Sequence, residues 1–426
     1  MKNTKTIISI FAAAVALSSA AIAQNATCAN GYTAELPCGN FGLNALSQKI
    51  SDTQNKIASD TGITFSFDYY ADIFSNPSGG VAQGTNYTHI MIFGADIDLQ
   101  KIAGIKNASI TVSGAYNAGR DLSGKIGNFY TVSQSAITTG VMFYEMYYTQ
   151  KFELCNGDTL AFKAGRMSMS DDFAGLPVFG YLAGGAMDSA PEAIFYASPF
   201  TSQTLAAWGI SATYQTCADL AFSAGLYQVP DSINDSGWHG TYFGMGNNDG
   251  YMIMAQMAWS PTLAGDLDGI YQLGGYFFDG YDMSYLDASR AGFKSDGFGF
   301  YIQGQQEIWV DSPDKNRTIT IWAGAQFAPV KSTSPITWQT YAGLQFAGFV
   351  PHRPDDSVFL SWTSGFFSGN YNNGNSDCET VLEANYLFTV NSNISLQPVV
   401  QYIIDPRGDS DISNAFVLGG QLLVSF

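Results

Sequence analysis

Two neighbourhoods of opposite charge are the first residues in this sequence whose types and spacing indicate chemistry. Arg120 directly precedes Asp121, and Arg166 stands five residues before the pair Asp171 and Asp172. A cation that faces carboxylates across a passage sets up a transverse field, and both groups can hydrogen-bond hydroxyls. We therefore expect these side chains to contact solutes rich in hydroxyl groups. A second interpretation stays open, in which Arg166 pairs with an acid and only pins a loop.

Enzymatic chemistry is poorly supported by the remaining residues. The chain has three histidines, His89, His239 and His352, and contains neither HExxH nor GxSxG. General acid–base and nucleophilic catalysis usually need an activated side chain, most often through histidine. We expect no catalytic residue, no metal site and no cofactor. Activity on a lipid or peptide remains the enzymatic alternative.

Composition narrows the class of protein further. Charged residues make up 13% of the 426 residues, against 30 Phe, 24 Tyr and 45 Gly, and the net charge is −18. This balance suits a barrel with lipid outside and water inside, and a soluble β-sandwich array is the alternative. The acidity argues against nucleic-acid binding. It predicts that neutral solutes and cations pass a pore more readily than small anions, unless the acids bind divalent cations at outer loops.

The N-terminus has the features of a secretory signal. Lys2 and Lys5 precede an apolar run and the small-residue pattern AIA at 21–23, so we expect residues 1–23 to be removed. Removal would leave 16 basic and 36 acidic residues, a net charge of −20. Residues 24–62 predict a periplasmic segment with a short amphipathic helix, or a loose tail, and residues 63–426 a barrel.

From Gly62 onward, short segments alternate between apolar and polar residues, which is typical of strands with one wet face. The fold class is therefore predicted to be all-β, an antiparallel transmembrane β-barrel of about sixteen strands. Expected strands lie near 63–74, 87–99, 108–117, 140–154, 159–167, 204–215, 219–229, 250–260, 269–281, 297–310, 317–328, 336–349, 356–368, 379–390, 393–404 and 414–426.

The connections between these strands alternate between short and long. Links after the even-numbered strands are short, as at 155–158 and 391–392, whereas the longest connection, 168–203, follows the fifth strand. Outer-membrane barrels have short periplasmic turns, so we expect an outer-membrane location with both termini in the periplasm. Phe426 ends the last strand and resembles the aromatic signal read by the barrel-insertion machinery.

The loop 168–203 is expected to fold inward as a constriction, with a surface flap as the alternative. It contains Asp171, Asp172 and Phe173. Sugars are bound by polar groups that meet their hydroxyls and by aromatic faces that stack on the ring. Simple parity sends Arg166 outward, so its placement at the constriction requires a bulge or an early end of the strand. Strand parity points further candidates inward: Asp68, Glu145, Lys163, Glu307, Trp309, Trp322, Glu383 and Gln401.

Five cysteines in an exported chain suggest disulfides. The expected topology places Cys28, Cys38, Cys155 and Cys217 at the periplasmic end, and Cys378 alone at the outer end. Four thiols at one end allow three connectivities, and intermolecular cross-links in the envelope stay open.

Several motifs recur in a fixed order over most of the chain: GITFSFDYYADIFSNPSGG (62–80), GRMSMSDDFAG (165–175), WGISATYQ (208–215), HGTYFGMGNNDGYMIMAQMAW (239–259), PHRPDD (351–356), LEANYLF (382–388) and LQPVVQYIIDPRG (396–408). With them the chain resembles the carbohydrate-selective porins of the OprB type. It departs from their pattern in its acidity, its five cysteines and Gln256, where a carboxylate is common.

The resemblance implies an outer-membrane porin for passive diffusion of small carbohydrates. The alternatives are a general cation-tolerant diffusion porin and a disulfide-linked envelope protein with pore activity. Expected partners are outer-membrane lipid and lipopolysaccharide, small sugars, small neutral or cationic solutes, and a second copy of the chain in a homo-oligomer.

Overall fold

The structure is a computed structural model that describes residues 43–136, 140–234, 236–244, 246, 249–263, 266–287, 289–312, 315–371 and 377–426. The expected signal, Cys28 and Cys38 lie outside the described residues.

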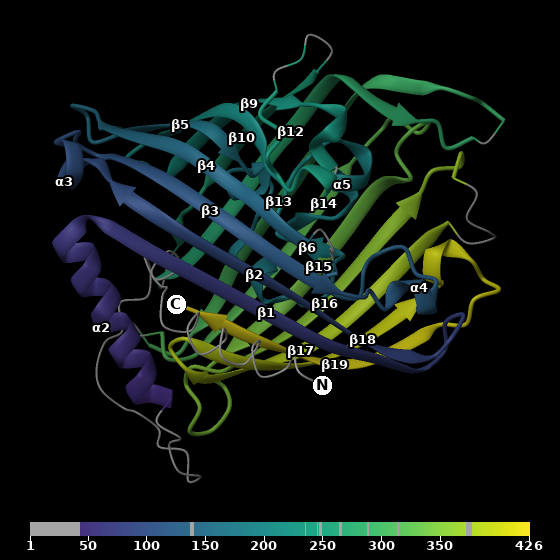
Figure 1. Ribbon diagram of the computed structural model, residues 1–426. Helices are drawn as coiled ribbons and strands as arrows, with labels where there is room; N and C mark the ends of the chain where they lie inside the picture. Colours follow the sequence, from purple (N-terminus) through teal and green to yellow (C-terminus); the bar gives the residue numbers. More distant parts are fainter. Residues whose placement is uncertain are drawn as a thin grey trace, which may run out of the picture.

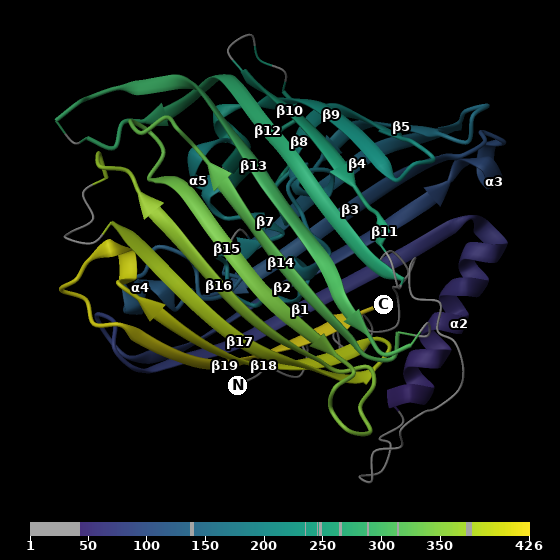
Figure 2. The same ribbon diagram turned by 180° about the vertical axis from the view of Figure 1, so that it is seen from behind.

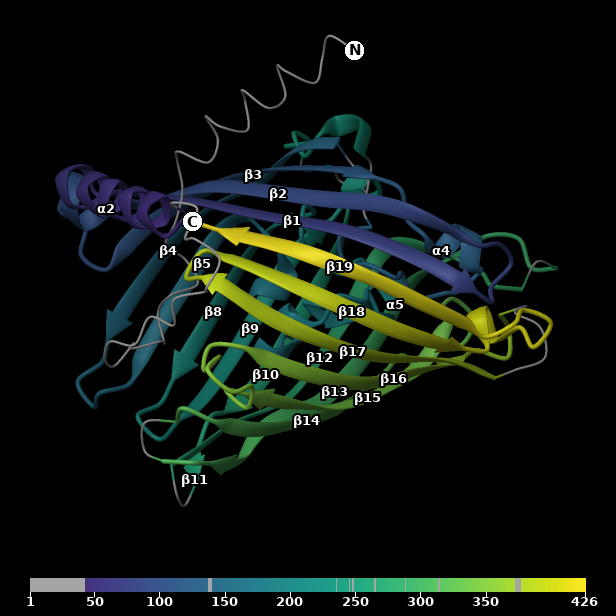
Figure 3. The ribbon, with the colours of Figure 1, turned by 90° about the horizontal axis from the view of Figure 1, so that it is seen from below.

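Sixteen long antiparallel strands in the described residues form one closed sheet, so the predicted barrel is confirmed (Figures 1 and 2). The sheet closes where β1 pairs with β19, from Asp68 opposite Ser425 to Ser78 opposite Phe416, which leaves no free edge. Figure 3 shows these two strands side by side. The long strands are β1 (Ile63–Ser78), β2 (Gly84–Asp98), β3 (Ala108–Gly119), β4 (Gly140–Glu153), β5 (Thr159–Met167), β8 (Ala207–Gln215), β9 (Leu220–Val229), β10 (Gly250–Trp259), β12 (Leu267–Ser284), β13 (Phe293–Val310), β14 (Thr318–Phe327), β15 (Ile336–Ala347), β16 (Ser357–Phe367), β17 (Cys378–Asn391), β18 (Ile394–Ile404) and β19 (Ala415–Ser425).

Alternation along each strand decides which side chains face the barrel interior. On β13, Phe298, Phe300 and Ile302 point outward and are about half exposed. Tyr301 and Gln303, which alternate with them, are buried inside. This period of two gives the wall an apolar outer surface around a more polar interior. No helix of the described segments is both long and apolar enough to cross a membrane.

The two ends of the barrel differ. At the end we call the turn end, strands are joined by short links such as 154–158, 216–219 and 392–393. At the opposite end, the loop end, the connections 120–139, 168–206 and 230–249 are long. Short elements lie in the connections: β11 (Thr262–Leu263), α3 (Leu99–Ala103), α4 (Ser123–Ile126), η3 (Asp231–Asn234), η4 (Ser236–Trp238) and η5 (Pro406–Gly408).

Helix α2 (Leu43–Thr61) lies at the turn end, inside the segment for which the sequence predicted a helix (Figure 3). Ile50 is buried in one cluster with Phe67 of β1 and the terminal Phe426. Lys101 Nζ, from the β2–β3 link, donates to Ala58 O at 3.1 Å. The helix is therefore fixed to the wall at the point where the barrel closes.

Residues 168–206, which we call the inner loop, run inside the barrel rather than over its mouth. The loop contains η1 (Met169–Asp171), η2 (Pro177–Tyr181), β6 (Met187–Asp188), β7 (Ala190–Pro191) and α5 (Ala193–Ala197). Figures 1 and 2 show α5, β6 and β7 surrounded by the strands of the wall. Its apolar residues pack against buried side chains of the wall in two large clusters. The loop therefore fills part of the barrel interior.

Candidate substrate pathway

A belt of side-chain amides holds the inner loop against the barrel wall. Gln256 Oε1 on β10 accepts a hydrogen bond from Ala174 N at 3.0 Å, and Gln303 Nε2 on β13 donates to Ala174 O at 2.8 Å. Amides can satisfy both backbone donors and acceptors without carrying charge. Gln256 Oε1 also accepts from the Tyr301 hydroxyl at 2.6 Å. The amide belt comprises Gln256, Gln272, Gln303, Gln305, Gln339, Asn385 and Gln397.

Two aromatic residues predicted for the substrate pathway instead anchor this loop. Phe173 is 1% exposed and packs edge-on against Tyr227 at a ring distance of 6.4 Å. Trp322 is 2% exposed and packs edge-on against Phe179 at 5.9 Å. Both rings point inward as expected, but the loop covers them. Neither presents a face to a solute.

The edge of the inner loop that remains exposed consists of Asp171, Pro177, Gly180 and Tyr181. The Tyr181 ring is 40% exposed and stacks on buried Phe359 of β16, with centroids 5.2 Å apart. Its backbone oxygen accepts from the amides of Asn385 and Gln397. Tyr181 thus offers a rigid, partly open aromatic face.

A charged cluster adjoins this edge on the inner wall of β4 and β5. Lys163 Nζ forms an ion pair with Asp172 at 2.5 Å and lies 5.3 Å from the centre of the Tyr147 ring. Buried Glu145 receives a hydrogen bond from Ser168 N at 3.1 Å, and its carboxyl group also hydrogen-bonds that of Asp171. We call Glu145, Tyr147, Lys163, Asp171 and Asp172 the charged cluster.

The cation of this cluster is therefore Lys163, and the expectation that Arg166 faces the aspartates is wrong. Arg166 is 6% exposed, and its Nε donates to Tyr144 O at 3.1 Å. It lines a small cavity of about 20 Å³ together with Trp208 and residues of the 230–249 connection, including Tyr242. Among the described ion pairs, none includes Arg166. Arg166 packs within the wall under a neighbouring loop.

The other predicted arginine–aspartate pair also separates. Arg120 is exposed, and its backbone N donates to Tyr87 O at 3.0 Å. Asp121 accepts from Ser123 Oγ at 3.0 Å, and no described ion pair joins it to Arg120. Burial raises the pKa of the Asp121 carboxyl above its ordinary value. Asp121 therefore shapes its own loop.

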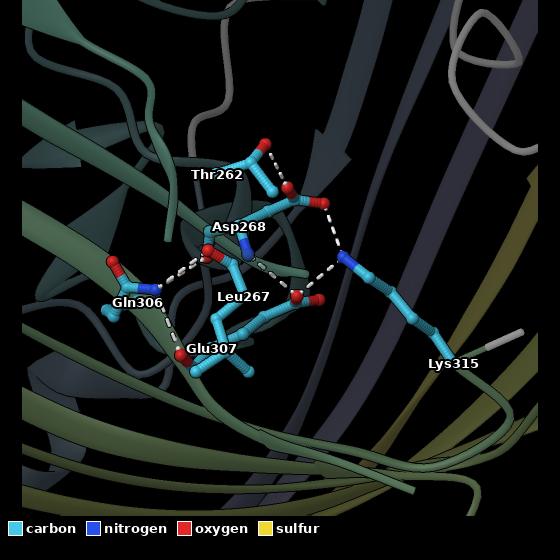
Figure 4. Close-up of polar contacts among 6 residues, drawn as sticks. All are labelled: Thr262, Leu267, Asp268, Gln306, Glu307 and Lys315. Carbon is cyan, nitrogen blue, oxygen red and sulfur yellow. Dashed lines mark hydrogen bonds and ion pairs between the residues drawn. The ribbon is translucent and has the colours of Figure 1, made fainter. Parts of the chain in front are cut away.

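Glu307 and Trp309 lie at the turn end of β13, just beyond Gln305, which bonds Val178 N of the inner loop. Glu307 Oε2 forms an ion pair with Lys315 at 2.8 Å, and Lys315 also contacts Asp268 at 2.5 Å (Figure 4). The strand pairing shifts between Glu307 and Trp309, so Trp309 lies opposite outward-facing Ile319. The inward placement of Trp309 is therefore wrong, because a β-bulge reverses the parity beyond Glu307.

Below the charged cluster, the inner wall is polar. A hollow of about 740 Å³ at the turn end is lined by side chains of β1 to β5 and β8, including Thr64, Asp96, Thr149, Thr213 and Gln215. Hydroxyl, amide and carboxylate groups of this kind keep such a space hydrated. The turn-end side of the interior is therefore polar along β1 to β5 and β8.

The sequence pattern led us to prefer Arg166 to Lys163 as the cation of this site, and it did not indicate Tyr147 or Tyr181. Lys163 has inward parity and could have been preferred to Arg166 on that ground, because no bulge is needed for it. Tyr147 also alternates inward with Lys163 on the paired strand. Tyr181 had no local signal, since a loop has no period from which the exposed side can be inferred.

Two of the described cysteines, Cys155 and Cys217, are free thiols in the structure. Cys155 and Cys217 are exposed in neighbouring turns, and Cys378 is partly buried on β17. No group of three metal-ligating side chains occurs in the described segments.

A closed barrel with an apolar outside, a polar interior and a loop folded into that interior defines the class of outer-membrane diffusion channels, the porins. Residues 82–426 match the model of the carbohydrate-selective porin, OprB family, and the chain belongs to this family. It is accordingly a carbohydrate-selective porin of the outer membrane.

Similar proteins and structures agree with this assignment. The putative porin QuiX of Acinetobacter baylyi is 24% identical over 410 residues, which cover 86% of this chain and 89% of that protein. Porin B of Pseudomonas aeruginosa is 23% identical over 415 residues, covering 86% and 88%. The high-pH structure of Pseudomonas putida OprB has a TM-score of 0.79 and 21% identity, covering 88% of this chain and 97% of that one.

Proposed function

We propose that sugars cross this porin between the exposed edge of the inner loop and the facing wall of β1 to β5. The proposal is carried by the partly exposed Tyr181 ring on the inner loop. The hollow at the turn end, which is lined by hydroxyl, amide and carboxylate groups, supports it. Aromatic faces stack on the C–H surface of a sugar ring, and the polar groups exchange hydrogen bonds with its hydroxyls. Passage is passive diffusion down a gradient.

The charged cluster supports a preference for neutral and cationic solutes over small anions. The hydrogen bond between the Glu145 and Asp171 carboxyl groups holds one proton, so this pair carries a single negative charge. Together with Asp172 it still outnumbers the one positive charge of Lys163, and Asp68 adds a carboxylate on β1. A bore with excess negative charge raises the local concentration of cations and excludes anions. A general cation-tolerant porin without a sugar site is the second candidate, and the same excess of acids favours it.

Liposome swelling separates the two candidates. Purified protein is reconstituted, and glucose entry is compared with entry of an uncharged non-sugar solute of equal size. If the pore has a sugar site, glucose should enter faster than the other solute, and Tyr181→Ala should slow glucose entry in part. Equal rates for the two solutes in the unaltered protein would leave only the general porin.

We also infer that the turn end faces the periplasm, and that residues 1–23 are a signal removed on export. Short turns and the C-terminus at the same end support this orientation. The apolar outer surface would contact outer-membrane lipid and lipopolysaccharide. Labelling of engineered cysteines in intact cells, one at the loop end and one at the turn end, tests the orientation. Reaction of the turn-end thiol alone would reverse it.

Cys155 and Cys217 support a disulfide between two neighbouring periplasmic turns. Thr159 pairs with Gln215, and a Cβ placed on Gly157 would lie 4.0 Å from Cys217 Cβ. Both thiols are free in the structure, and pairings with Cys28 or Cys38 remain alternatives. An envelope scaffold linked through these thiols would instead give a ladder of oligomers on a non-reducing gel. A monomer whose mobility shifts on reduction would favour the internal bridge.

A further inference from the structure

We propose that Glu383 of β17 is a positioning residue that sets the width of the bore by clamping the tip of the inner loop. The inference rests on the proposed passage between that loop and the facing wall. It concerns a residue that contacts no solute and acts through Tyr181 and its neighbours.

The Glu383 carboxylate is 6% exposed and receives four hydrogen bonds. Oε1 accepts from Ala183 N at 2.9 Å and from Asn385 Nδ2 at 2.8 Å. Oε2 accepts from Gly184 N at 2.8 Å and from Gln401 Nε2 at 3.0 Å. Hydrogen bonds to an ionised acceptor are among the stronger ones in proteins. Two successive backbone groups of the loop are thus fixed to one side chain.

All four groups around the Glu383 carboxylate are N–H donors, so the side chain at this position has to act only as a hydrogen-bond acceptor. No Lys or Arg forms an ion pair with Glu383 in the described part of the chain, so these N–H groups alone meet its charge. A glutamine at 383 would turn an NH₂ group toward a donor, because each oxygen faces a backbone N–H. The isosteric change therefore breaks the clamp and leaves the side-chain volume unchanged.

The clamp is tight and lies next to the exposed edge of the loop. A Cβ added at Gly184 would come within 2.7 Å of Glu383 Oε2, so residue 184 needs to be glycine for this approach. Tyr181 lies two residues before Ala183, and its backbone oxygen is held by Asn385 of the same strand at 3.0 Å. Glu383 and its neighbour on β17 therefore fix the part of the loop that carries the open aromatic ring.

Glu383→Gln tests the clamp in planar bilayers and in liposomes, with Asp68→Asn as the matched control. Asp68 lies on β1, points into the bore and bonds Ser425, so its replacement removes one negative charge without touching the inner loop. We expect both variants to lower cation selectivity. Only Glu383→Gln should raise single-channel conductance and current noise and admit larger oligosaccharides.

A disulfide that replaces the hydrogen bonds between residue 383 and the loop should restore the normal conductance. A general structural role of Glu383 does not predict this recovery. Gly184→Cys with Glu383→Cys, in a background without the native cysteines, should restore the original conductance when oxidised. The same double variant should resemble Glu383→Gln when reduced. Folding of each barrel is checked by its heat-dependent mobility on a gel.

The outcomes also separate this inference from the function on which it rests. If Glu383→Gln forms a folded barrel with unchanged conductance and sugar size limit, while Tyr181→Ala slows sugar entry, the clamp is refuted and the passage stands. If neither variant changes sugar entry, the proposed passage fails, and the clamp fails with it.

Discussion

At the level of single residues, the important feature of the bore is the identity of the cation that pairs with the carboxylates of the charged cluster. Lys163 reaches Asp172 from an inward position on β5, whereas Arg166 three residues later is buried in the wall. The ion pair is partly shielded from solvent, so removing the ammonium leaves carboxylates without their counter-charge. The two basic residues give a test within one strand.

Lys163→Met should shift the reversal potential toward stronger cation selectivity, because the carboxylates of the charged cluster lose their cation. Arg166→Met is the matched control and should leave the reversal potential nearly unchanged. The measurement is the zero-current potential across a bilayer in a salt gradient. A larger shift in the Arg166 variant would place the arginine at the bore after all.

At the scale of elements, the inner loop is a separate unit seated on a preformed wall. Its apolar side packs into clusters of wall residues, and the amide belt binds its backbone. Because the wall is held by its own strand pairing, loosening this loop should leave the barrel intact.

Phe173→Ala should loosen the loop, since truncation of a buried phenylalanine costs about 3–5 kcal/mol. We expect noisier channels and faster proteolysis within 168–206, with the β-sheet circular dichroism signal unchanged. Phe162→Ala is the control, because the Phe162 ring is 44% exposed on the outer surface. If the Phe173 variant shows unchanged proteolysis of the loop, packing of Phe173 against the wall does not hold the loop in place.

The seat of the loop should also depend on pH. Burial raises the pKa of Asp188, in β6 of the loop, from 3.8 to about 7, and burial also raises that of Glu192 nearby. The neutral acids are favoured when the loop is seated. Their contribution is therefore complete below about pH 4 and is lost as pH rises toward and beyond 7. Current noise should increase over this window, and Asp188→Asn should flatten the increase.

At the scale of the whole molecule, the last residue takes part in the pairing that closes the barrel. Phe426 is 3% exposed, donates its N–H to Phe67 O at 2.9 Å, and accepts from Phe67 N at 3.0 Å. An alanine keeps both backbone bonds and loses only the ring. The alanine variant therefore tests whether the Phe426 ring stabilises the closed barrel or is recognised during membrane insertion.

Phe426→Ala should refold in detergent and yet assemble poorly in the outer membrane of cells, if the aromatic terminus is read by the insertion machinery. The measurement is the yield of the heat-modifiable form, in detergent and in isolated outer membranes. Equal losses in both settings would assign the ring to packing against Ile50 and Phe67. Equal yields would remove both roles.

The barrel was predictable from the amino-acid sequence, because side chains alternate every two residues along a strand and this pattern is local. All sixteen expected strands appear near their predicted positions, and the inward parity of Lys163 and Glu383 needed no tertiary information. The members of the site could not be predicted in this way. The bulge at Trp309, the burial of Arg166 beneath another loop and the exposed Tyr181 ring depend on contacts between segments distant in the chain. Such contacts have no period and cannot be read from neighbouring residues.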